Sequence, residues 1–292
     1  MRILNFGSLN IDHVYRVEHL TRAGETQTAE YSRQPGGKGL NQSVALAMAG
    51  AEVYHAGLIG SDGDFLRTRL ADSGVDCSFL SAVNEPSGHA VVQVDRAGEN
   101  SIILFPGCNH SLRRSQIDRV LGHFGRGDLL LLQNEINEIP YLMEQAAARG
   151  MEIAFNAAPM TEAVRSYPLG LVRWLILNQT EAAALSGETE PERCAARLCE
   201  GRPRLELILT LGADGVLYRH GDMSLFIPAR RVEAVDTTGA GDAFIGFFLA
   251  AMADGADPGY SLTHGTAAAA LTVTRPGAAD SLPSMEEVLK NP

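Results

Sequence analysis

The stretch Asp128-Leu129-Leu130-Leu131-Leu132-Gln133 decides the fold class of this 292-residue chain. The run is apolar on both faces of an extended chain, so it predicts a strand buried on both sides. A helix-period segment over Ile139–Ala148 and a second apolar run over Glu152–Asn156 follow it. A strand, a helix and a strand in that order, with apolar strands, are typical of a parallel sheet covered by helices on both faces.

The same alternation extends along the chain in both directions. Further strands are predicted at Ile3–Ser8, Val53–Ile59, Trp174–Asn178 and Leu205–Leu211, and further helices at Asn41–Ala49, Ser115–Phe124, Thr180–Leu185 and Ala243–Ala253. No internal repeat or low-complexity linker interrupts the pattern. The sequence therefore predicts one α/β domain over residues 1–292, with ligand sites beyond the C-terminal ends of the strands.

Two segments break the alternation. Strands are predicted at Val14–Val17 and Thr26–Ser32 around a turn near Ala23-Gly24, and at Ala90–Val94 and Ser101–Phe105 as a hairpin. Neither pair is expected to lead into a helix, so both are predicted to leave the main sheet and to pair with each other. A small sheet formed by about 12–34 and 88–105 would act as a lid over the ligand. Two surface hairpins without a gating role are the alternative.

Composition excludes several classes of protein. Apolar residues make up 45% and charged residues 20% of the chain, which supports a packed core. A net charge of -11 argues against nucleic acid as a partner, because an acidic surface repels a phosphate backbone. Only two of the 24 basic residues are lysines, Lys38 and Lys290, which makes Lys38 conspicuous within a glycine-rich segment.

The chain carries no sign of export or of a membrane span. The four cysteines (Cys77, Cys108, Cys194, Cys199) form no CxxC pair and are expected to be reduced thiols without zinc. The N-terminus has a strand pattern rather than a signal peptide. The longest apolar run, Ala243–Ala253, is far shorter than the ~20 residues that span a bilayer. These features predict a cytoplasmic protein.

The segment Asp236-Thr237-Thr238-Gly239-Ala240-Gly241-Asp242 precedes the apolar helix. Gly239 and Gly241 allow close backbone approach, and the helix start directs free N–H groups at a bound anion. A carboxylate at this place, Asp242, repels an anion unless it accepts a proton from a hydroxyl that attacks a phosphoryl group. Helix capping is the alternative explanation of Asp242.

A second glycine-rich segment, Pro35-Gly36-Gly37-Lys38-Gly39-Leu40-Asn41-Gln42, opens the first long helix. Its spacing is not that of a Walker P-loop, and no GxGxxG follows the first strand, so a Rossmann dinucleotide site is disfavoured. Asn10 and Asp12 follow the C-terminal end of the first predicted strand. Amide and carboxylate groups suit the vicinal hydroxyls of a sugar, with an Asx turn as the alternative.

In these motifs the chain resembles the ribokinase-type members of the PfkB family of carbohydrate kinases. The resemblance rests on PGGKGLNQ at 35–42 and DTTGAGDAF at 236–244, and it extends from Gly7–Asp12 to Arg275–Ala278. Intermediate matches are Gly98–Ser101, Asn178–Glu181 and Thr210–Gly215. The resemblance implies a ribokinase-like three-layer α/β/α fold with a mostly parallel central sheet and a small β lid.

The resemblance also implies roles for individual residues. Asp242 would be the catalytic base, and Gly239, Ala240 and Gly241 would form the anion hole. Sugar binding falls to Asn10, Asp12, Gly37, Lys38, Gly39, Asn41 and Glu135. Nucleotide binding falls to Asn178 and to Thr210, Gly212, Asp214 and Gly215 in the segment after a predicted strand. Glu181 would organise Mg²⁺ through water.

Two further positions concern the nucleotide and a second cation. Thr266 stands where ribokinases often carry His or Asn near the adenine, so this contact departs from the family pattern. A subset of the family binds a monovalent cation, which here would be K⁺ held mostly through backbone carbonyls. The residues for that site are Asp236, Thr238, Thr272, Arg275, Gly277 and Ser281.

These observations predict an ATP-dependent kinase that phosphorylates a terminal sugar hydroxyl, with the 5-hydroxyl of D-ribose as the first candidate. A nucleoside kinase or a kinase for fructose or deoxyribose is the alternative within the family. A catalytically silent sugar- or ATP-binding regulator is the alternative outside enzymes. ATP, Mg²⁺ and K⁺ are the implied cofactors, and a homodimer through the β lid is the implied assembly, without nucleic acid or membrane.

Overall fold

The computed structural model describes residues 1–291 and is built on a nine-stranded sheet in the order β13-β12-β11-β10-β9-β8-β1-β4-β5. Neighbouring strands are parallel from β11 to β5, whereas β12 and β13 run antiparallel at one edge. The strands are β1 (Ile3–Phe6), β4 (Val53–Ile59), β5 (Asp76–Ala82), β8 (Leu129–Gln133), β9 (Glu152–Asn156), β10 (Trp174–Asn178), β11 (Glu206–Thr210), β12 (Gly215–His220) and β13 (Met223–Pro228). The predicted, mostly parallel sheet is confirmed.

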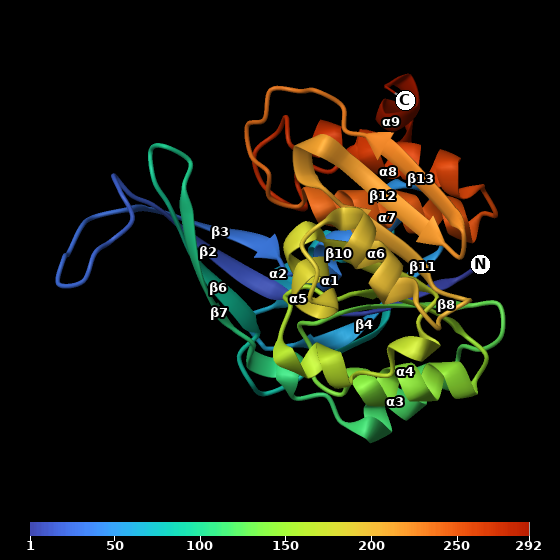
Figure 1. The fold of residues 1–292 in the computed structure, drawn as a ribbon. Helices are drawn as coiled ribbons and strands as arrows, with labels where there is room; N and C mark the ends of the chain where they lie inside the picture. Colours follow the sequence, from blue (N-terminus) through green and yellow to red (C-terminus); the bar gives the residue numbers. More distant parts are fainter. Residues whose placement is uncertain (292) are drawn as a thin grey trace.

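Helices cover both faces of this sheet (Figure 1). One layer contains α1 (Lys38–Met48), α2 (Asp64–Asp72), α7 (Ala240–Ala253), α8 (Pro258–Thr272) and α9 (Met285–Lys290); the other contains α3 (Arg114–Leu121), α4 (Ile139–Ala148), α5 (Gln179–Ser186) and α6 (Pro191–Cys199). Leu129 and Leu131 of β8 pack into the first layer, and Leu130 and Leu132 into the second. The tetra-leucine run therefore joins both hydrophobic cores, as its pattern predicts.

A second sheet of four strands lies beside the main body, in the order β3-β2-β6-β7. It contains β2 (Asn10–Arg16), β3 (Glu30–Gly36), β6 (Gly88–Val94) and β7 (Asn100–Phe105). The two predicted hairpins pair with each other through parallel β2 and β6. In Figure 1 this sheet projects away from the helical layers. We call it the lid sheet.

Several predicted boundaries are wrong. The segment 26–29 is loop, and the strand predicted there is β3, which begins at Glu30 and leads almost directly into α1. The expectation that no helix follows the first hairpin is therefore wrong. The helix α1 also begins at Lys38 rather than Asn41, and α7 begins at Ala240 rather than Ala243. Both helices extend back into their glycine-rich segments. The sequence pattern missed these first turns because glycine and other small residues give no apolar periodicity.

The helices α1 and α7 pack unusually closely. A Cβ atom at Gly246 of α7 would lie 2.3 Å from Ala45 Cβ and 2.7 Å from the Ala45 carbonyl carbon. Only glycine fits this contact, since the obstructing atoms include backbone that cannot move aside. The contact fixes α7, and with it the glycine-rich segment at its start, relative to α1.

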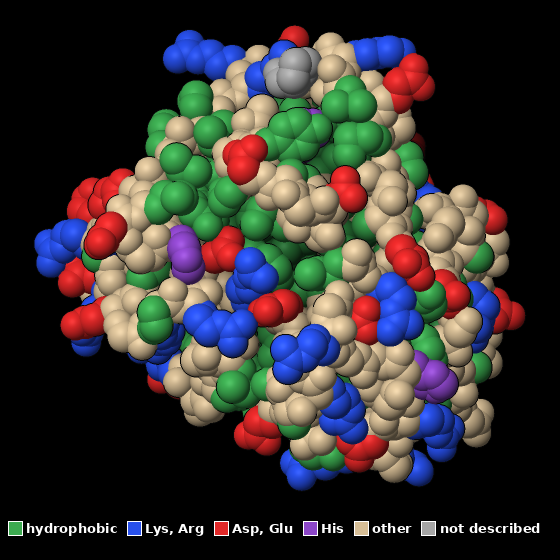
Figure 2. All heavy atoms as spheres, turned by 90° about the vertical axis from the view of Figure 1, so that its right-hand side faces the viewer, with side chains coloured by type: hydrophobic (Ala, Val, Ile, Leu, Met, Phe, Trp, Pro, Cys, Tyr) green, Lys and Arg blue, Asp and Glu red, His purple; other side chains and the backbone are tan. Residues whose placement is uncertain are grey.

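Ion pairs join the beginnings of the parallel strands, on the side of the molecule opposite the lid sheet. Arg2 pairs with Asp128 at 2.6 Å, Arg173 pairs with Glu206 at 3.0 Å, and Arg204 pairs with Glu152 at 3.2 Å. Figure 2 looks onto this side, where acidic and basic side chains are interspersed over its lower half. Charged groups at this edge therefore pair mainly with one another.

Over residues 1–291, none of the helices is both long enough and apolar enough to cross a membrane. Cys77, Cys108, Cys194 and Cys199 are all free thiols, as predicted.

Candidate active site

The predicted functional residues gather along one edge of the main sheet, at the C-terminal ends of its parallel strands. Asn10 and Glu135 follow the neighbouring strands β1 and β8, and Asn178 and Thr210 end the neighbouring strands β10 and β11. Within the sheet, β1 lies between β4 and β8, so the connections that follow β1 and β8 diverge in opposite directions. Such a switch point opens a crevice in which α/β proteins bind ligands.

Asp242 lies in the first turn of α7 and is only 7% exposed. Its Oδ2 accepts a hydrogen bond from Asn41 Nδ2 at 3.0 Å, and its Oδ1 accepts one from Gln42 Nε2 at 2.8 Å. No cation lies within ion-pair distance of this carboxylate among residues 1–291. A buried carboxylate held by neutral amides keeps lone pairs free to accept a proton.

The start of α7 presents backbone N–H groups beside Asp242. Gly239 adopts a left-handed conformation (φ 79°), which lets the chain turn sharply into the helix. Within the described residues, the N–H groups of Gly241 and Asp242 have no hydrogen-bond acceptor. Space beside Gly241 is open, since a Cβ atom there would meet nothing within 4 Å. Unpaired amides at a helix start form a site for an anion.

Asn10 and Asp12 lie at the root of the lid sheet. The Asn10 side-chain oxygen accepts a hydrogen bond from Asn109 Nδ2 at 2.8 Å, which fixes the orientation of the Asn10 amide. Asp12 rests on the backbone of Gly36, where a Cβ atom would lie 2.0 Å from Asp12 Oδ2. Burial and then the nearby carboxylate of Glu135 raise the pKa of Asp12 to about 7.

Glu135 connects the loop after β8 to the start of α1. Its Oε2 accepts hydrogen bonds from Ser8 Oγ at 2.5 Å and from the Lys38 backbone N–H at 3.0 Å. Gly37 has φ 94°, and a Cβ atom at Gly39 would lie 2.4 Å from Ser8 N. Both glycines are therefore required for α1 to start directly above the end of β1.

Lys38 supplies the positive charge of the crevice. Burial would lower the pKa of Lys38, but the carboxylates of Asp242, Glu135 and Glu181 outweigh burial and raise it. Lys38 therefore remains charged, and it interacts with residues from both the predicted sugar region and the predicted nucleotide region.

Asn178 and Glu181 form a capping box at the start of α5. Glu181 N–H donates to Asn178 Oδ1 at 2.8 Å, and Asn178 N–H donates to Glu181 Oε2 at 2.9 Å. Glu181 is 8% exposed, and burial raises its pKa against the opposing effects of the Asn178 N–H and Lys38. Both residues thus have a structural role in addition to any contact with a ligand.

The remaining nucleotide candidates lie farther along the sheet. Thr210 ends β11, and the turn that follows carries Gly212, the exposed Asp214 and Gly215 before β12. Gly215 has φ 130°, and a Cβ atom there would lie 2.1 Å from a backbone oxygen, so only glycine fits. Thr266, on α8, has a buried hydroxyl without a hydrogen-bond partner in the described part of the chain.

The predicted K⁺ residues lie in two segments, 236–238 and 272–281, which backbone hydrogen bonds join. Asp236 accepts hydrogen bonds from the N–H groups of Thr238 and Gly277, each at 2.9 Å. Burial would raise the pKa of Asp236, but these hydrogen bonds outweigh burial and lower it. The other members make local contacts: the Thr272 and Ser281 hydroxyls donate to Ala268 O and Ala278 O, and Arg275 pairs with Glu287 at 2.5 Å.

Sequence reasoning assigned no role to four residues that shape this site. Ser8 binds Glu135, Asn109 orients Asn10, and Asn156 and Gln42 lie behind Asp242. Ser8 and Gln42 fall inside the motifs quoted above, so position in a motif was a signal for them. Asn109 and Asn156 lie outside the motifs, and their contacts join residues about 100 positions apart.

Comparison with known proteins agrees with this geometry. Residues 2–285 match the model of the pfkB family carbohydrate kinases. Ribokinase from Haemophilus influenzae is 35% identical over 294 residues, covering 97% of this chain and 96% of that protein. Deoxyribokinase from Salmonella typhi is 31% identical over 298 residues, covering 98% and 97%. The structure of Arabidopsis thaliana ribokinase complexed with ribose and ATP superposes with a TM-score of 0.87 at 30% identity, covering 99% and 97%.

The raised pKa of Asp12 predicts a pH-dependent stability in the absence of sugar. A carboxyl group that binds its proton more tightly in the folded state stabilises the fold below its ordinary pKa, and this contribution is lost as pH rises through 7. Asp12→Asn removes the titration. Its unfolding free energy, relative to that of the unaltered chain, should therefore rise by roughly 2 kcal/mol or more between about pH 4 and pH 8.

Denaturant unfolding across this pH range measures the difference. Asp222→Asn, at an exposed position in the turn between β12 and β13, is the matched control and should give a constant difference. A constant difference for Asp12→Asn as well would contradict the prediction.

Proposed function

The chain belongs to the pfkB family of carbohydrate kinases, and from this premise we propose that it transfers the γ-phosphoryl group of ATP to the 5-hydroxyl of D-ribose. The observation that carries the proposal is the buried carboxylate of Asp242 beside the unpaired amides at the start of α7. A proton acceptor and an anion site within one helical turn are the two elements that attack by a hydroxyl on a phosphoryl group requires.

In the proposed reaction, Asp242 accepts the proton of the sugar hydroxyl as its oxygen attacks phosphorus. Asn41 and Gln42 hold the two carboxylate oxygens, so the base is oriented before the sugar arrives. The buried Oδ1 of Asn41 has no partner within residues 1–291 and is available to accept a hydrogen bond from a sugar hydroxyl. Asn10, Asp12 and Glu135 supply further groups for the remaining hydroxyls.

Charge on the transferring phosphoryl group is balanced by the protein in two ways. The unpaired N–H groups of Gly241 and Asp242 form the anion site. The ammonium of Lys38 adds a positive charge that interacts with Asp242. Bound ATP would extend toward Asn178 and the turn from Thr210 to Gly215. Since the reaction consumes ATP, we place it in the cytoplasm.

Glu181 fits the proposed role toward Mg²⁺. One carboxylate oxygen is used by the Asn178 N–H, and the other has no hydrogen bond in the described chain, which leaves it for a metal-bound water. The ion would supply charge neutralisation on the phosphates of ATP. No group of three or more His, Cys, Asp or Glu side chains capable of holding a metal occurs over residues 1–291, in keeping with an ion held largely by substrate and water.

Asp236 supports K⁺ as a further proposed component. Its lowered pKa keeps the carboxylate charged, and its hydrogen bonds tie the anion-hole segment to Gly277. A monovalent cation held by nearby backbone carbonyls would offset this charge and keep the segment in place. The Arg275 side chain pairs with Glu287, whereas the Thr272 and Ser281 hydroxyls donate to carbonyls and keep lone pairs for a cation.

Deoxyribose is the second candidate acceptor, since the similar protein from Salmonella typhi is a deoxyribokinase. The two sugars differ only in the 2-hydroxyl, so their discrimination depends on whether a buried polar group is left unpaired. Asn10, oriented by Asn109, and Asp12 are the groups whose pairing a missing hydroxyl would disturb.

A panel of acceptors tests the substrate. ADP release should be fastest with D-ribose, slower with deoxyribose, and slowest with fructose and adenosine, and it should be faster in K⁺ than in Na⁺. If ADP release were fastest with deoxyribose or adenosine, that compound and not ribose would be the substrate. Tight sugar binding without turnover on any acceptor would favour a regulator. Equal rates of ADP release in K⁺ and Na⁺ would refute the proposed role of K⁺.

Asp242→Asn tests the proposed base. Replacing the carboxylate by an amide of the same shape removes the proton acceptor, so kcat should fall at least ~100-fold while the affinities for sugar and ATP change little. Steady-state kinetics and calorimetric binding separate these quantities. Asp222→Asn is the control for loss of one acidic residue, and near-normal turnover of Asp242→Asn would refute the assignment.

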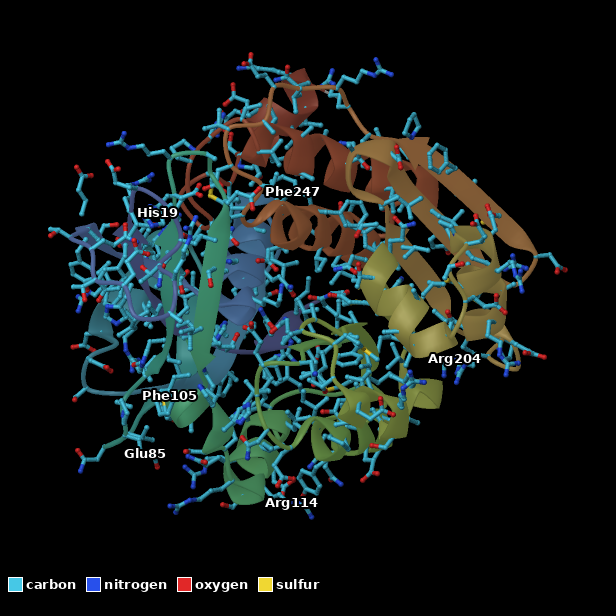
Figure 3. The ribbon with its side chains drawn as sticks, turned by 60° about the vertical axis from the view of Figure 1, so that its left-hand side comes forward. His19, Glu85, Phe105, Arg114, Arg204 and Phe247 are labelled. Atoms are coloured by element: carbon cyan, nitrogen blue, oxygen red, sulfur yellow. The ribbon has the colours of Figure 1, made fainter. Side chains whose placement is uncertain are left out.

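We further propose that the whole chain acts as one domain and forms a homodimer through the lid sheet. Strand β7 is one edge of that sheet, and it exposes Ile102 (57%), Ile103 (67%), Leu104 (43%) and Phe105 (46%). Phe105 lies on the lid side of the molecule, away from Phe247 of α7 (Figure 3). Four consecutive exposed apolar residues on a sheet edge favour burial against a partner.

Sedimentation equilibrium tests this assembly. The chain should sediment at twice its mass of 31.2 kDa, and Ile103→Lys should shift it to a single chain, because a charge opposes burial of that edge. Ser101→Lys, on the same strand, controls for added charge. A single-chain mass for the unaltered protein would exclude the dimer.

A further inference from the structure

Gln42 of α1 is fully buried and lies directly behind Asp242. Its Nε2 donates hydrogen bonds to Asp242 Oδ1 at 2.8 Å and to Asn156 Oδ1 at 3.2 Å. We propose that Gln42 is a positioning residue for phosphoryl transfer, and that a chain of buried polar groups behind it forces Gln42 to present N–H to the carboxylate. The inference rests on the proposed role of Asp242 as the base.

The polar chain extends from Gln42 to His55 of β4 through the interior of the molecule. Gln133 Nε2 donates to Gln42 Oε1 at 2.7 Å and to Asn5 Oδ1 at 3.0 Å. Asn5 Nδ2 donates to Ser43 Oγ at 2.8 Å, and Ser43 Oγ lies 2.8 Å from His55 Nδ1. Each group therefore contacts the next at hydrogen-bond distance.

The direction of the hydrogen bonds between Asp242 and Ser43 follows from the carboxylate. An ionised carboxylate only accepts, so Gln42 must present its N–H to Asp242, and its carbonyl oxygen must then accept from Gln133. The second N–H of Gln133 goes to the Asn5 carbonyl oxygen, so Asn5 donates to the Ser43 hydroxyl.

In the tautomer that carries its proton on Nε2, His55 Nδ1 accepts a hydrogen bond from the Ser43 hydroxyl. Burial lowers the pKa of His55 to about 4, so its ring is neutral at physiological pH and can accept this hydrogen bond. A neutral His55 ring is therefore compatible with the direction of donation that the Asp242 carboxylate sets.

Burial makes this direction costly to reverse. Asn5, Gln42, Ser43 and His55 are 0% exposed and Gln133 is 1% exposed. Turning the Gln42 amide over would place its carbonyl oxygen against the Asp242 carboxylate and two N–H groups against Gln133. Water cannot reach these groups to compensate, so the reversed state is strongly disfavoured.

Asn41 keeps an unpaired oxygen for the proposed sugar, whereas Gln42 does not. Gln42 has all its polar atoms engaged inside the protein, so orientation of Asp242 is its contribution to the site. The charged group facing Asp242 from α1 is Lys38, which Glu135 and Glu181 face in turn. These three charges are unchanged in the variants described below.

Gln42→Glu tests the inference with almost no change in side-chain volume. It replaces the donor by a second carboxyl group, and two carboxyl groups at hydrogen-bond distance share a proton. The acid limb of the kcat/KM profile should move up by about one pH unit or more, and kcat at pH 7 should fall at least about tenfold. The KM values for sugar and ATP should change less than about threefold, since binding groups are retained.

Gln145→Glu is the matched control, because it adds the same charge on α4, where Gln145 contacts Arg149. Its pH profile should equal that of the unaltered enzyme. A folded Gln42→Glu enzyme with an unaltered pH profile would overturn the inference. If turnover also survives in Asp242→Asn, the proposed role of Asp242 as the base fails; if Asp242→Asn is inactive, only the role of Gln42 fails.

Gln133→Leu provides a second test if Gln42→Glu does not fold. This change leaves Gln42 in place but removes the donor that fixes its carbonyl oxygen. We expect kcat to fall several-fold with both KM values retained, because Gln133 touches Asp242 only through Gln42. Unchanged kcat in the folded Gln133→Leu variant would overturn the proposed chain of groups.

Discussion

The close packing of α1 against α7 is the constraint on which the site depends. Gly246 meets the backbone of Ala45 where no side chain fits, and one turn earlier Asp242 receives hydrogen bonds from Asn41 and Gln42. The two helices are about 200 residues apart in sequence, yet both begin at glycine-rich segments above the same edge of the sheet. Their packing places the proposed base, the unpaired amides of α7 and the proposed sugar-binding loop side by side.

Electrostatics in this crevice do not follow from net charge. The chain carries a net charge of -11, yet its proposed ligand is a nucleotide with several negative charges. Local positive potential comes from unpaired N–H groups at the start of α7 and from Lys38, which three carboxylates keep protonated. The acidic surface opposes extended polyanions, whereas a single small anion experiences mainly these nearby groups.

The lid sheet and the crevice are continuous along the chain. Strand β2 begins with Asn10, two residues before Asp12, and β3 ends at Gly36, next to the start of α1. Both ends of the first hairpin are therefore attached to proposed sugar-binding residues. A displacement of the lid sheet would therefore move these residues directly.

The sequence alone determined the strands from β11 to β4 in the sheet, since apolar runs such as 129–133 are buried wherever they lie, and it determined the two glycine-rich segments, since their chemistry is local. It did not predict β5 or β13, which are edge strands and partly exposed, nor β12, whose short apolar run ends in Arg219 and His220. Only the tertiary structure decided that Asn109 orients Asn10, that Ser8 binds Glu135 and that Gln42 holds Asp242. These contacts join residues 99 to 200 positions apart, and periodicity carries no information on which strand ends become neighbours.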